Sequence, residues 1–290
     1  MPTKNSSLAF ATHEGLRALG ENDRLLANHF VQYGLTVEAV VWNDPNVDWD
    51  QFERVVIRST WDYYHKVEDY KRWINNFKQR STRLINPPDV VLTNLHKGYL
   101  LDLAQQGFNV IPSQLFKAGD LTQPDELIAH IPWQDFVVKP AIGASAFDVA
   151  RLSKELTHNQ RETVQTLMNR GDFIVQPFIN EIRQLGEWSF IFIDHRFSHT
   201  VIKRPQQDDF RVQNRYGGHY QQAMPTKNLI KQAETFINAI DGRATYARVD
   251  AVEVSGELLL IELELNEPCL FFDENNPAAM LHFLEAIGNA

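Results

Sequence analysis

The sequence predicts an α/β (α+β) protein, in which a small N-terminal domain with an open parallel sheet precedes a larger region of mixed strands and helices. Two observations carry this prediction. Over residues 8–77, short apolar runs alternate with a helical repeat, which is typical of a parallel sheet with short connections. After residue 186, apolar runs follow one another across tight turns, as antiparallel strands do.

The N-terminal elements follow from periodicity and from residues that end helices. Leu8–Thr12, Thr36–Val41 and Phe52–Ile57 are apolar or rich in β-branched residues, so we expect three strands. Asn22–Tyr33 carries apolar side chains at helical spacing, and Gly34 suits the C-cap of that helix. Strand, helix, strand, strand in this order predicts the open parallel sheet.

Two polar side chains lie just past the third strand. Arg58 and Asp62 follow its carboxyl end, which is where open α/β sheets bind ligands. Arg58 is therefore a candidate for binding a substrate carboxylate. A local ion pair that caps the next helix, Val67–Phe77, is the alternative interpretation of both residues.

A proline-rich segment separates the N-terminal domain from the rest. Asn86–Asp89 contains two prolines and indicates a linker, so we place the first domain boundary after residue 93. The next helix is expected at Leu95–Gln105, with Lys97 near its start and Gly107 ending it. A lone lysine in such a place is usually solvated, unless a phosphate lies nearby.

Two segments in the middle of the chain suit a nucleotide. Phe136–Pro140 is an apolar strand that carries Lys139, and small residues follow at Ala141–Ala146. Small residues let backbone N–H groups approach phosphate oxygens, although a surface turn would look the same and GxxxxGK[ST] is absent. The apolar strand Asp172–Ile179 ends in Gln176–Ile179, whose backbone groups and apolar neighbours suit an adenine ring.

A hairpin then leads into a basic segment. Gly186–Ser189 precedes the strand Phe190–Ile193, which turns at Asp194–Arg196 and returns over Phe197–Lys203. His199 alternates within this strand and is interpreted as structural. The basic cluster consists of Lys203, Arg204, Arg211 and Arg215, followed by Tyr216–Gly218. Such a cluster suits phosphate or carboxylate ligands, or it is a set of solvated loop charges.

The segment Tyr246–Pro268 is predicted to be a pair of strands with a three-residue turn at Ser255–Glu257. This register places Asp250 opposite Glu262 and Arg248 opposite Glu264. Opposed carboxylates repel, and Mg²⁺ prefers oxygen ligands. Either a metal site or a solvated acidic face with an Arg248–Glu264 pair would satisfy the pattern.

The remaining strand and helix predictions concern the core. The opposite face of the Tyr246–Pro268 strand pair is expected to be buried through Val249, Ala251, Ile261, Leu263 and Leu265. A helix before this pair is expected at Asn228–Ile240, and a C-terminal helix at Ala278–Ile287.

Composition excludes several classes of protein. A net charge of −9 over 290 residues disfavours a general nucleic-acid binder, which would carry a basic stripe. The single cysteine, Cys269, excludes an internal disulfide framework and a zinc cluster of thiolates. We see no secretory signal and no apolar run long enough to span a membrane, so a cytoplasmic location without membrane contact is expected.

Taken in order, these motifs resemble the ATP-grasp superfamily of ligases. The resemblance runs from Asn94 to the C-terminus: an early lysine, VVKP, a small-residue loop, QPFI, GE, a basic loop, then RVD and ELELNEP. Within this superfamily, the sequence is similar to the glutathione synthetase ATP-binding type and to the ribosomal-protein glutamate ligases. RSTWDYY and the YARVD…ELELNEP ending also resemble the D-cycloserine ligase branch. The fold implied is an ATP-grasp fold with a pre-ATP-grasp domain at 1–93, a central subdomain at 94–175 and a C-terminal subdomain at 176–290.

The resemblance assigns roles to individual residues. The implied nucleotide-binding residues are Lys97, Lys139, Ser145, Gln176, Pro177, Phe178, Ile179 and Glu187. The implied metal ligands are Asp250, Glu262 and Glu264, where Glu264 stands at a position that is Asn in many relatives. Arg211 and, with less support, Lys203 are the implied catalytic cations. Substrate is expected near Arg58, Asp62, Gly217 and Gly218.

The activity implied is an ATP- and Mg²⁺-dependent ligation of a small amino-acid-like or peptide carboxylate to an amine through an acylphosphate. Two Mg²⁺ ions are expected, with Mn²⁺ as a substitute, and a homodimer is compatible with the family. A small-molecule kinase with the same ATP site is one alternative. A non-catalytic nucleotide-binding protein is the other.

Overall fold

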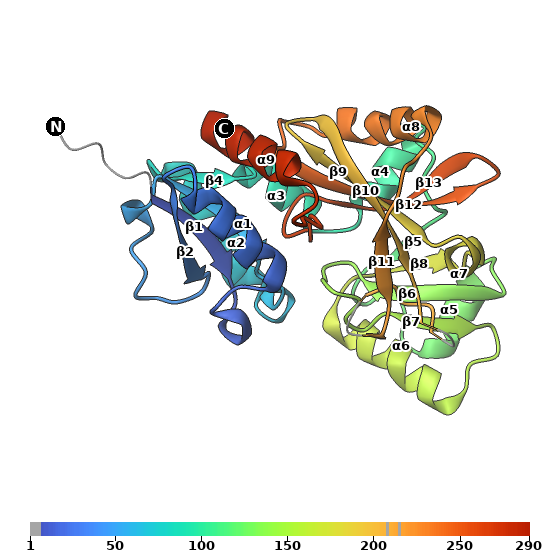
Figure 1. The fold of residues 1–290 in the computed structure, drawn as a ribbon. Helices are drawn as coiled ribbons and strands as arrows, with labels where there is room; N and C mark the ends of the chain where they lie inside the picture. The colour runs from blue at the N-terminus through green and yellow to red at the C-terminus, as the bar shows by residue number, and fades with distance from the viewer. Residues whose placement is uncertain (1–6, 207–208, 214–215) are drawn as a thin grey trace.

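The computed structural model describes residues 7–206, 209–213 and 216–290, and Arg215 of the basic cluster lies outside them. The described residues form three sheets with helices packed on their faces (Figure 1). The mixed α/β fold class predicted from the sequence is confirmed. The expected domain boundaries at 93/94 and 175/176 fall inside helix α3 (Pro88–Asn94) and strand β8 (Phe173–Pro177), and they stay a prediction.

The N-terminal sheet is parallel, with the strand order β2-β1-β3-β4. Its strands are β1 (Ser7–Thr12), β2 (Thr36–Val41), β3 (Arg54–Ser59) and β4 (Arg83–Ile85). Helix α1 (Glu21–Val31) packs on one face, and α2 (Val67–Asn76) packs on the other through a cluster rich in tryptophan. The predicted order of strands and helices in this part of the chain is confirmed.

The expected linker at 86–89 is a fixed connection. After Asn86 and Pro87 the chain enters helix α3 (Pro88–Asn94), and helix α4 (Tyr99–Gln105) follows after a turn. The Asn86 side chain is fully buried and hydrogen-bonds the backbone of distant residues at Tyr246 and Leu265. Lys97 lies in the turn between α3 and α4, so its predicted place inside a helix was wrong.

The central sheet has the strand order β5-β8-β6-β7 and is antiparallel. Its strands are β5 (Gln114–Phe116), β6 (Asp135–Pro140), β7 (Ala150–Ser153) and β8 (Phe173–Pro177). Helices α5 (Pro124–His130) and α6 (His158–Arg170) cover one face of this sheet. Their apolar side chains and those of the sheet form a separate hydrophobic core. Short helix α7 (Glu181–Gln184) then leads to the next sheet.

The C-terminal sheet has the order β11-β10-β9-β12-β13 and is also antiparallel. Its strands are β9 (Glu187–Ile193), β10 (Arg196–Arg204), β11 (His219–Gln222), β12 (Tyr246–Val254) and β13 (Glu257–Glu264). Helices α4 and α8 (Lys227–Asn238) cover one face. The other face meets the C-terminal helix α9 (Pro277–Asn289).

The turn between β12 and β13 differs from the prediction. It contains two residues, Ser255 and Gly256, both with positive φ, as a type I′ hairpin requires. A bulge next to Asp250 then inserts Ile261 and restores the predicted pairs, Asp250 with Glu262 and Arg248 with Glu264. Because of the bulge, Ile261 lines the cavity described below, so its expected place in the core was wrong.

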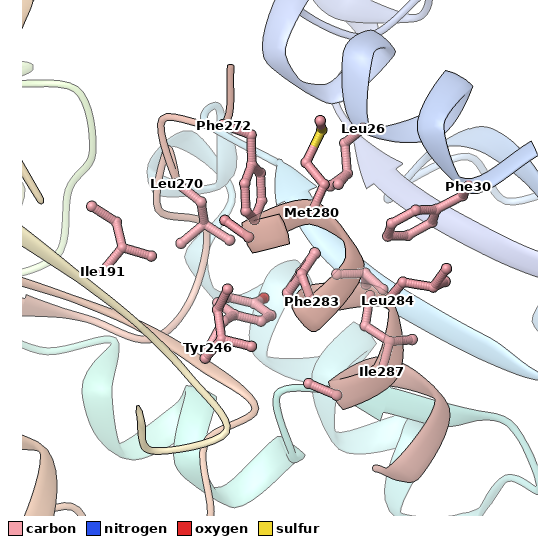
Figure 2. Close-up of a cluster of buried hydrophobic side chains, with 14 of the residues drawn as sticks. Leu26, Phe30, Ile191, Tyr246, Leu270, Phe272, Met280, Phe283, Leu284 and Ile287 are labelled. Atoms are coloured by element: carbon pink, nitrogen blue, oxygen red, sulfur yellow. The ribbon is translucent and has the colours of Figure 1, made fainter. Parts of the chain in front are cut away.

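Helix α9 joins the N-terminal and C-terminal sheets into one core. Figure 2 shows Met280, Phe283 and Leu284 of α9 between Leu26 and Phe30 of α1 and Tyr246 of β12. Figure 1 shows the same helix between the two sheets. The last segment of the chain therefore fixes the position of the first sheet relative to the C-terminal sheet.

Candidate functional site

A cavity of about 680 Å³ lies where the N-terminal domain, the central sheet and the C-terminal sheet meet. Its lining includes the following residues that the sequence had singled out: Asp62, Lys97, Lys139, Ser145, Gln176, Pro177, Phe178, Ile179, Glu187, Lys203, Arg211, Asp250, Glu262 and Glu264. These residues come from segments up to about two hundred positions apart in the chain, and the fold brings them to one site.

Asp250 is buried at the centre of a network of charges. Arg248 donates to both of its oxygens at 2.9 to 3.1 Å, and Lys203 Nζ lies 3.2 Å from Oδ1. Ser189 also donates to Oδ1. Burial alone would raise the pKa of Asp250, but the charges of Arg248 and Lys203 overcome that effect and hold it below its usual range. Asp250 is therefore ionised at neutral pH.

The two glutamates of β13 have different environments. Lys97 Nζ lies 3.1 Å from Glu262 Oε1. Burial opposes ionisation of Glu262, yet Lys97 and Lys139 lower its pKa below the usual value. Burial raises the pKa of Glu264 to about 7, against the charge of Arg248, with which Glu264 also pairs. An excess of carboxylates thus remains in a site with little water to screen it.

Lys139 and Lys203 are two more buried lysines beside this network, in addition to Lys97. Lys203 Nζ lies 2.5 Å from Glu187 Oε1 as well as near Asp250, and these carboxylates raise its pKa although burial opposes them. Lys139 forms no ion pair with any described residue. Burial lowers its pKa, and the neighbouring charge of Lys97 adds to that effect. An unpaired buried lysine suits an anionic ligand such as a phosphate.

The loop of small residues lies over the same cavity. Lys97 holds it, because its N–H donates to Ala141 O at 2.8 Å and its Nζ donates to Gly143 O at 2.9 Å. Ser145 has a positive φ of 54°, so the loop turns sharply here. At its end, Phe147 stacks on Tyr64 of the N-terminal domain with ring centroids 4.6 Å apart. The loop therefore bridges the central sheet and the N-terminal domain.

The segment expected to hold adenine has one free backbone donor. The N–H of Phe178 donates to Asp135 O at 3.0 Å, and Pro177 has no N–H. Ile179 N–H has no partner among the described residues, and so it is the donor that an adenine ring would use. The Phe178 ring is covered by Arg151, whose Cζ lies 3.7 Å from the ring centroid.

Arg211 lines the cavity but already has partners. It forms two hydrogen bonds to Asp209, at 2.9 and 3.1 Å, and lowers the pKa of that carboxyl to about 2. Its guanidinium lies 3.5 Å from the centroid of the Tyr216 ring, and the Tyr216 hydroxyl donates to Ala146 O at 3.3 Å. The basic segment and the small-residue loop are thus linked directly.

Three expected substrate residues lie outside the cavity lining. Arg58 is 2% exposed and pairs with Asp23 at 2.9 Å, 35 positions earlier in the chain. Gly217 and Gly218 pack against Gln206 and the backbone of Val212, with no room for a Cβ atom. Direct substrate binding by these three is therefore not supported by their positions. Asp62 lines the cavity, and Trp42 Nε1 donates to it at 2.7 Å.

Sequence reasoning missed several members of the site. Arg248 was expected to pair with Glu264 but also binds Asp250 and Cys269 O. Asn266 and Glu267, just after β13, line the cavity and are nearly fully buried. Burial and the charge of Glu264 raise the pKa of Glu267 to about 8. A polar pair directly after an alternating strand was the signal that could have identified them.

Whether the donor set suits Mg²⁺ can be tested on the side chains present. Asp250, Glu262 and Glu264 offer hard oxygen ligands, which are the ligands that Mg²⁺ prefers. In the described part of the chain, however, no three carboxylate, histidine or cysteine side chains converge into a metal-sized group. Arg248 pairs with both Asp250 and Glu264, and Lys97 pairs with Glu262. The donor chemistry fits Mg²⁺, and binding would require these pairs to rearrange.

Comparisons with known proteins agree with this geometry. A family model described as the N-terminal domain of D-cycloserine synthetase DcsG matches residues 8–86. The cycloserine biosynthesis protein DcsG of Streptomyces lavendulae is 31% identical over 269 residues, covering 88% of each chain. A crystal structure of D-cycloserine synthetase DcsG has a TM-score of 0.84 at 27% identity and covers 98% of this chain and 99% of that chain.

More distant structures share the fold. A D-alanine–D-alanine ligase from Bacillus anthracis, solved with ATP, has a TM-score of 0.67 at 12% identity and covers 98% of this chain and 96% of that chain. A RimK domain ATP-grasp protein from Sphaerobacter thermophilus has a TM-score of 0.64 at 15% identity, covering 98% of each chain. The sequence relative, which is 31% identical over 88% of each chain, shows that this chain belongs to the family of ATP-grasp ligases that includes D-cycloserine synthetase DcsG.

Proposed function

We propose that this ligase joins the carboxylate of a small amino-acid-like substrate to an amine through an acylphosphate formed from ATP. The observation that carries the proposal is the grouping of three lysines and three carboxylates around one cavity. Phosphoryl transfer needs positioning and charge neutralisation more than a covalent nucleophile, and the cavity supplies both. The family membership supports the same reaction class.

We assign different parts of ATP binding to different groups of side chains. Lys97, Lys139 and Lys203 would neutralise the phosphates and the charge that develops in the transition state. Gln176–Ile179 would bind adenine, with Ile179 N–H as the donor. Asp250, Glu262 and Glu264 would hold Mg²⁺, which when bound neutralises β- and γ-phosphate charge, and Mn²⁺ is the substitute ion we expect to work.

The chemistry of the ligation follows from this arrangement. The substrate carboxylate attacks the γ-phosphorus of ATP, the bond to the β–γ bridging oxygen breaks, and ADP leaves. The amine nitrogen then attacks the acyl carbon, phosphate leaves, and the nitrogen loses a proton. The small-residue loop and Phe147 exclude water, which would otherwise hydrolyse the acylphosphate.

Phosphate release tests this proposal. Mg·ATP is offered with amino acids, other small carboxylates and amines, alone, in pairs, and as compounds that carry both groups. The matched control is the Asp250→Asn/Glu262→Gln variant. We expect release that requires both an acid and an amine and disappears in the control. A phosphorylated hydroxyl product would instead show a kinase, and ATP binding without release for any compound would contradict an enzymatic role.

A further inference from the structure

We propose that His13 is a catalytic residue of the ligation, the general base that removes a proton from the amine before the amine attacks the acylphosphate. This inference rests on the proposed function, because it names the group that accepts a proton in the same reaction. The lone pair that accepts the proton is on Nε2 of the imidazole.

His13 lies at the carboxyl end of the parallel sheet, which is where open α/β sheets bind their ligands. It directly follows β1, and Ser59, which ends the neighbouring strand β3, pairs with Thr12. The His13 side chain lines the cavity, and its ring centroid lies 6.3 Å from that of Trp61. Among the described residues of the lining, His13 is the only histidine. The fold therefore brings one imidazole to the cavity that the lysines also line.

One hydrogen bond determines which ring nitrogen of His13 carries the proton. Nδ1 lies 2.7 Å from the backbone oxygen of Ser59. A carbonyl oxygen only accepts, so Nδ1 is the donor, and in the neutral ring Nε2 carries the lone pair. Ser59 is fully buried, and its hydroxyl donates to Asp23, which also accepts from Arg58. The carbonyl that orients the ring is thus held in place, as the partner of a general base should be.

The other ring nitrogen is free to react. Nε2 has no hydrogen-bond partner among the described residues, and it keeps accessible surface. A Cβ atom at Gly15 would lie 3.2 Å from Nε2, so a side chain at this position would crowd the nitrogen, whereas glycine leaves room beside it. Nε2 can therefore accept a proton from a ligand in the cavity and later release it to water.

The other acidic side chains of the lining are poor proton acceptors. Four of its carboxylates each pair with a lysine or arginine: Glu187, Asp250, Glu262 and Glu264. Burial raises the pKa of Glu267 to about 8, so this carboxyl is mostly protonated at neutral pH. Burial also raises the pKa of Tyr63 and of Cys269, which therefore keep their protons. Among the described residues, Asp62, which accepts from Trp42, remains as the rival base.

The reaction needs a proton acceptor because an aliphatic amine is mostly an ammonium ion at neutral pH and has no lone pair with which to attack. Nε2 takes one proton from the ammonium nitrogen, and the freed electron pair attacks the acyl carbon. The bond from this carbon to the phosphate oxygen breaks, and phosphate leaves and takes up the second proton that the nitrogen loses. The imidazolium then gives its proton to water, which restores the base.

Two nucleophiles that differ in their need for a base test this role. The full chain is given Mg·ATP and the acid found by phosphate release, together with either the amine found there or hydroxylamine, which is unprotonated at neutral pH. His13→Asn, whose amide can still donate to Ser59 O, should lower kcat/KM for the amine by roughly 100-fold or more. Hydroxamate formation should be unchanged, because acylphosphate formation and attack by an unprotonated nucleophile need no base. A compound that carries both groups is tested in the same way, with hydroxylamine intercepting its acylphosphate.

A second histidine provides the matched control. His130 Nδ1 makes the same kind of bond, to Glu126 O at 2.7 Å, on an exposed part of α5 that does not line the cavity. His130→Asn should therefore change neither reaction. Thermal unfolding shows whether His13→Asn folds. If it does not, Gly15→Ala replaces it, because the added methyl group crowds Nε2 and should slow the amine reaction more mildly.

The outcomes separate a catalytic role of His13 from the alternatives. Equal losses with both nucleophiles would show a structural role, and an unchanged amine reaction would show no role, so either result would overturn the proposal. A selective loss of the amine reaction in Asp62→Asn, with His13→Asn unaffected, would also overturn it and assign the base to Asp62. Failure of the unaltered chain to release phosphate with any acid would instead refute the proposed function, and this inference with it.

Discussion

Replacing Asn86 should destabilise the protein more than any single exposed substitution, because this side chain joins the N-terminal domain to the C-terminal sheet. Its Nδ2 donates to Tyr246 O at 2.8 Å and to Leu265 O at 2.7 Å. Its Oδ1 accepts from Thr245 N at 2.6 Å and from Tyr246 N at 3.1 Å. All four bonds are buried, so no water replaces them when the side chain is removed.

The magnitude follows from these four groups. Asn86→Ala leaves two N–H groups and two carbonyls without that partner, and at about 1 kcal/mol each the loss is about 4 kcal/mol. With an unfolding entropy of about 2 cal/mol/K per residue, this lowers the Tm of the 290-residue chain by roughly 7 °C. Thermal unfolding of the purified variant measures the shift.

Two other asparagines provide graded controls. Asn94 makes two such bonds, to Leu263 O at 2.7 Å and from Leu265 N at 2.9 Å, so Asn94→Ala should cost about half as much. Asn75 makes one exposed bond, to Lys71 O, and Asn75→Ala should be nearly neutral. If Asn86→Ala costs no more than Asn94→Ala, the four bonds do not act as the geometry indicates, and the reasoning is refuted.

Two further predictions concern buried titratable groups. Lys139→Met should lower kcat/KM for ATP by roughly 100-fold or more, because a phosphate loses its cation. The variant's Tm should not fall, because no described residue pairs with Lys139, and a lower Tm in the purified variant would count against this assignment. Burial lowers the pKa of His199, so below about pH 6.5 the unfolded chain takes up a proton that the folded chain resists. The contribution of His199 to stability should therefore decrease as the pH falls from 7 to 5, against the opposite contribution of Glu264 and Glu267, whose pKa values are raised. The difference in Tm between the unmutated protein and His199→Gln should shift in favour of His199→Gln over this range; an unchanged difference would contradict the prediction.

The shared fold does not by itself select a substrate. The D-alanine–D-alanine ligase has the same fold at 12% identity, so the choice of acid and amine depends on residues that differ between relatives. In this chain we propose that the N-terminal part of the cavity lining, such as Trp61 and Tyr63, and the segment after β13 make this choice, because they line the cavity away from the lysines.

Among the residues that the structure describes, none of the helices has the length and apolar character needed to span a membrane.

Some features were predictable because they depend on local sequence. Strand alternation placed Asp250 opposite Glu262, and the structure has that pair although the turn is one residue shorter than expected. The shorter turn shifts the pairing of the two strands by one residue, and the extra residue at the bulge, Ile261, shifts it back. A bulge arises from pairing with another strand, so the period of a single strand does not reveal it.

Other features depended on residues far apart in the chain. The sequence placed Arg58 just past a strand, as a ligand-binding residue would lie. In the structure Arg58 lies within β3, and the packing of α1 against this strand brings Asp23 to it. The sequence placed Asn86 in a linker, whereas in the structure its partners are Tyr246 of β12 and Leu265, directly after β13. Hydrogen-bond partners at such separations leave no periodic signal in the sequence.

The sequence by itself determined the fold class, the order of the motifs and most of the side chains that line the cavity, because periodicity and residue chemistry are local properties. Only the tertiary structure decided which charges are compensated. It paired Lys97 with Glu262, placed Arg248 between Asp250 and Glu264, and left Glu267 and Lys139 without an ion-pair partner among the described residues. Burial and distance set the energy of a charge, and both exist only once the three sheets have packed together.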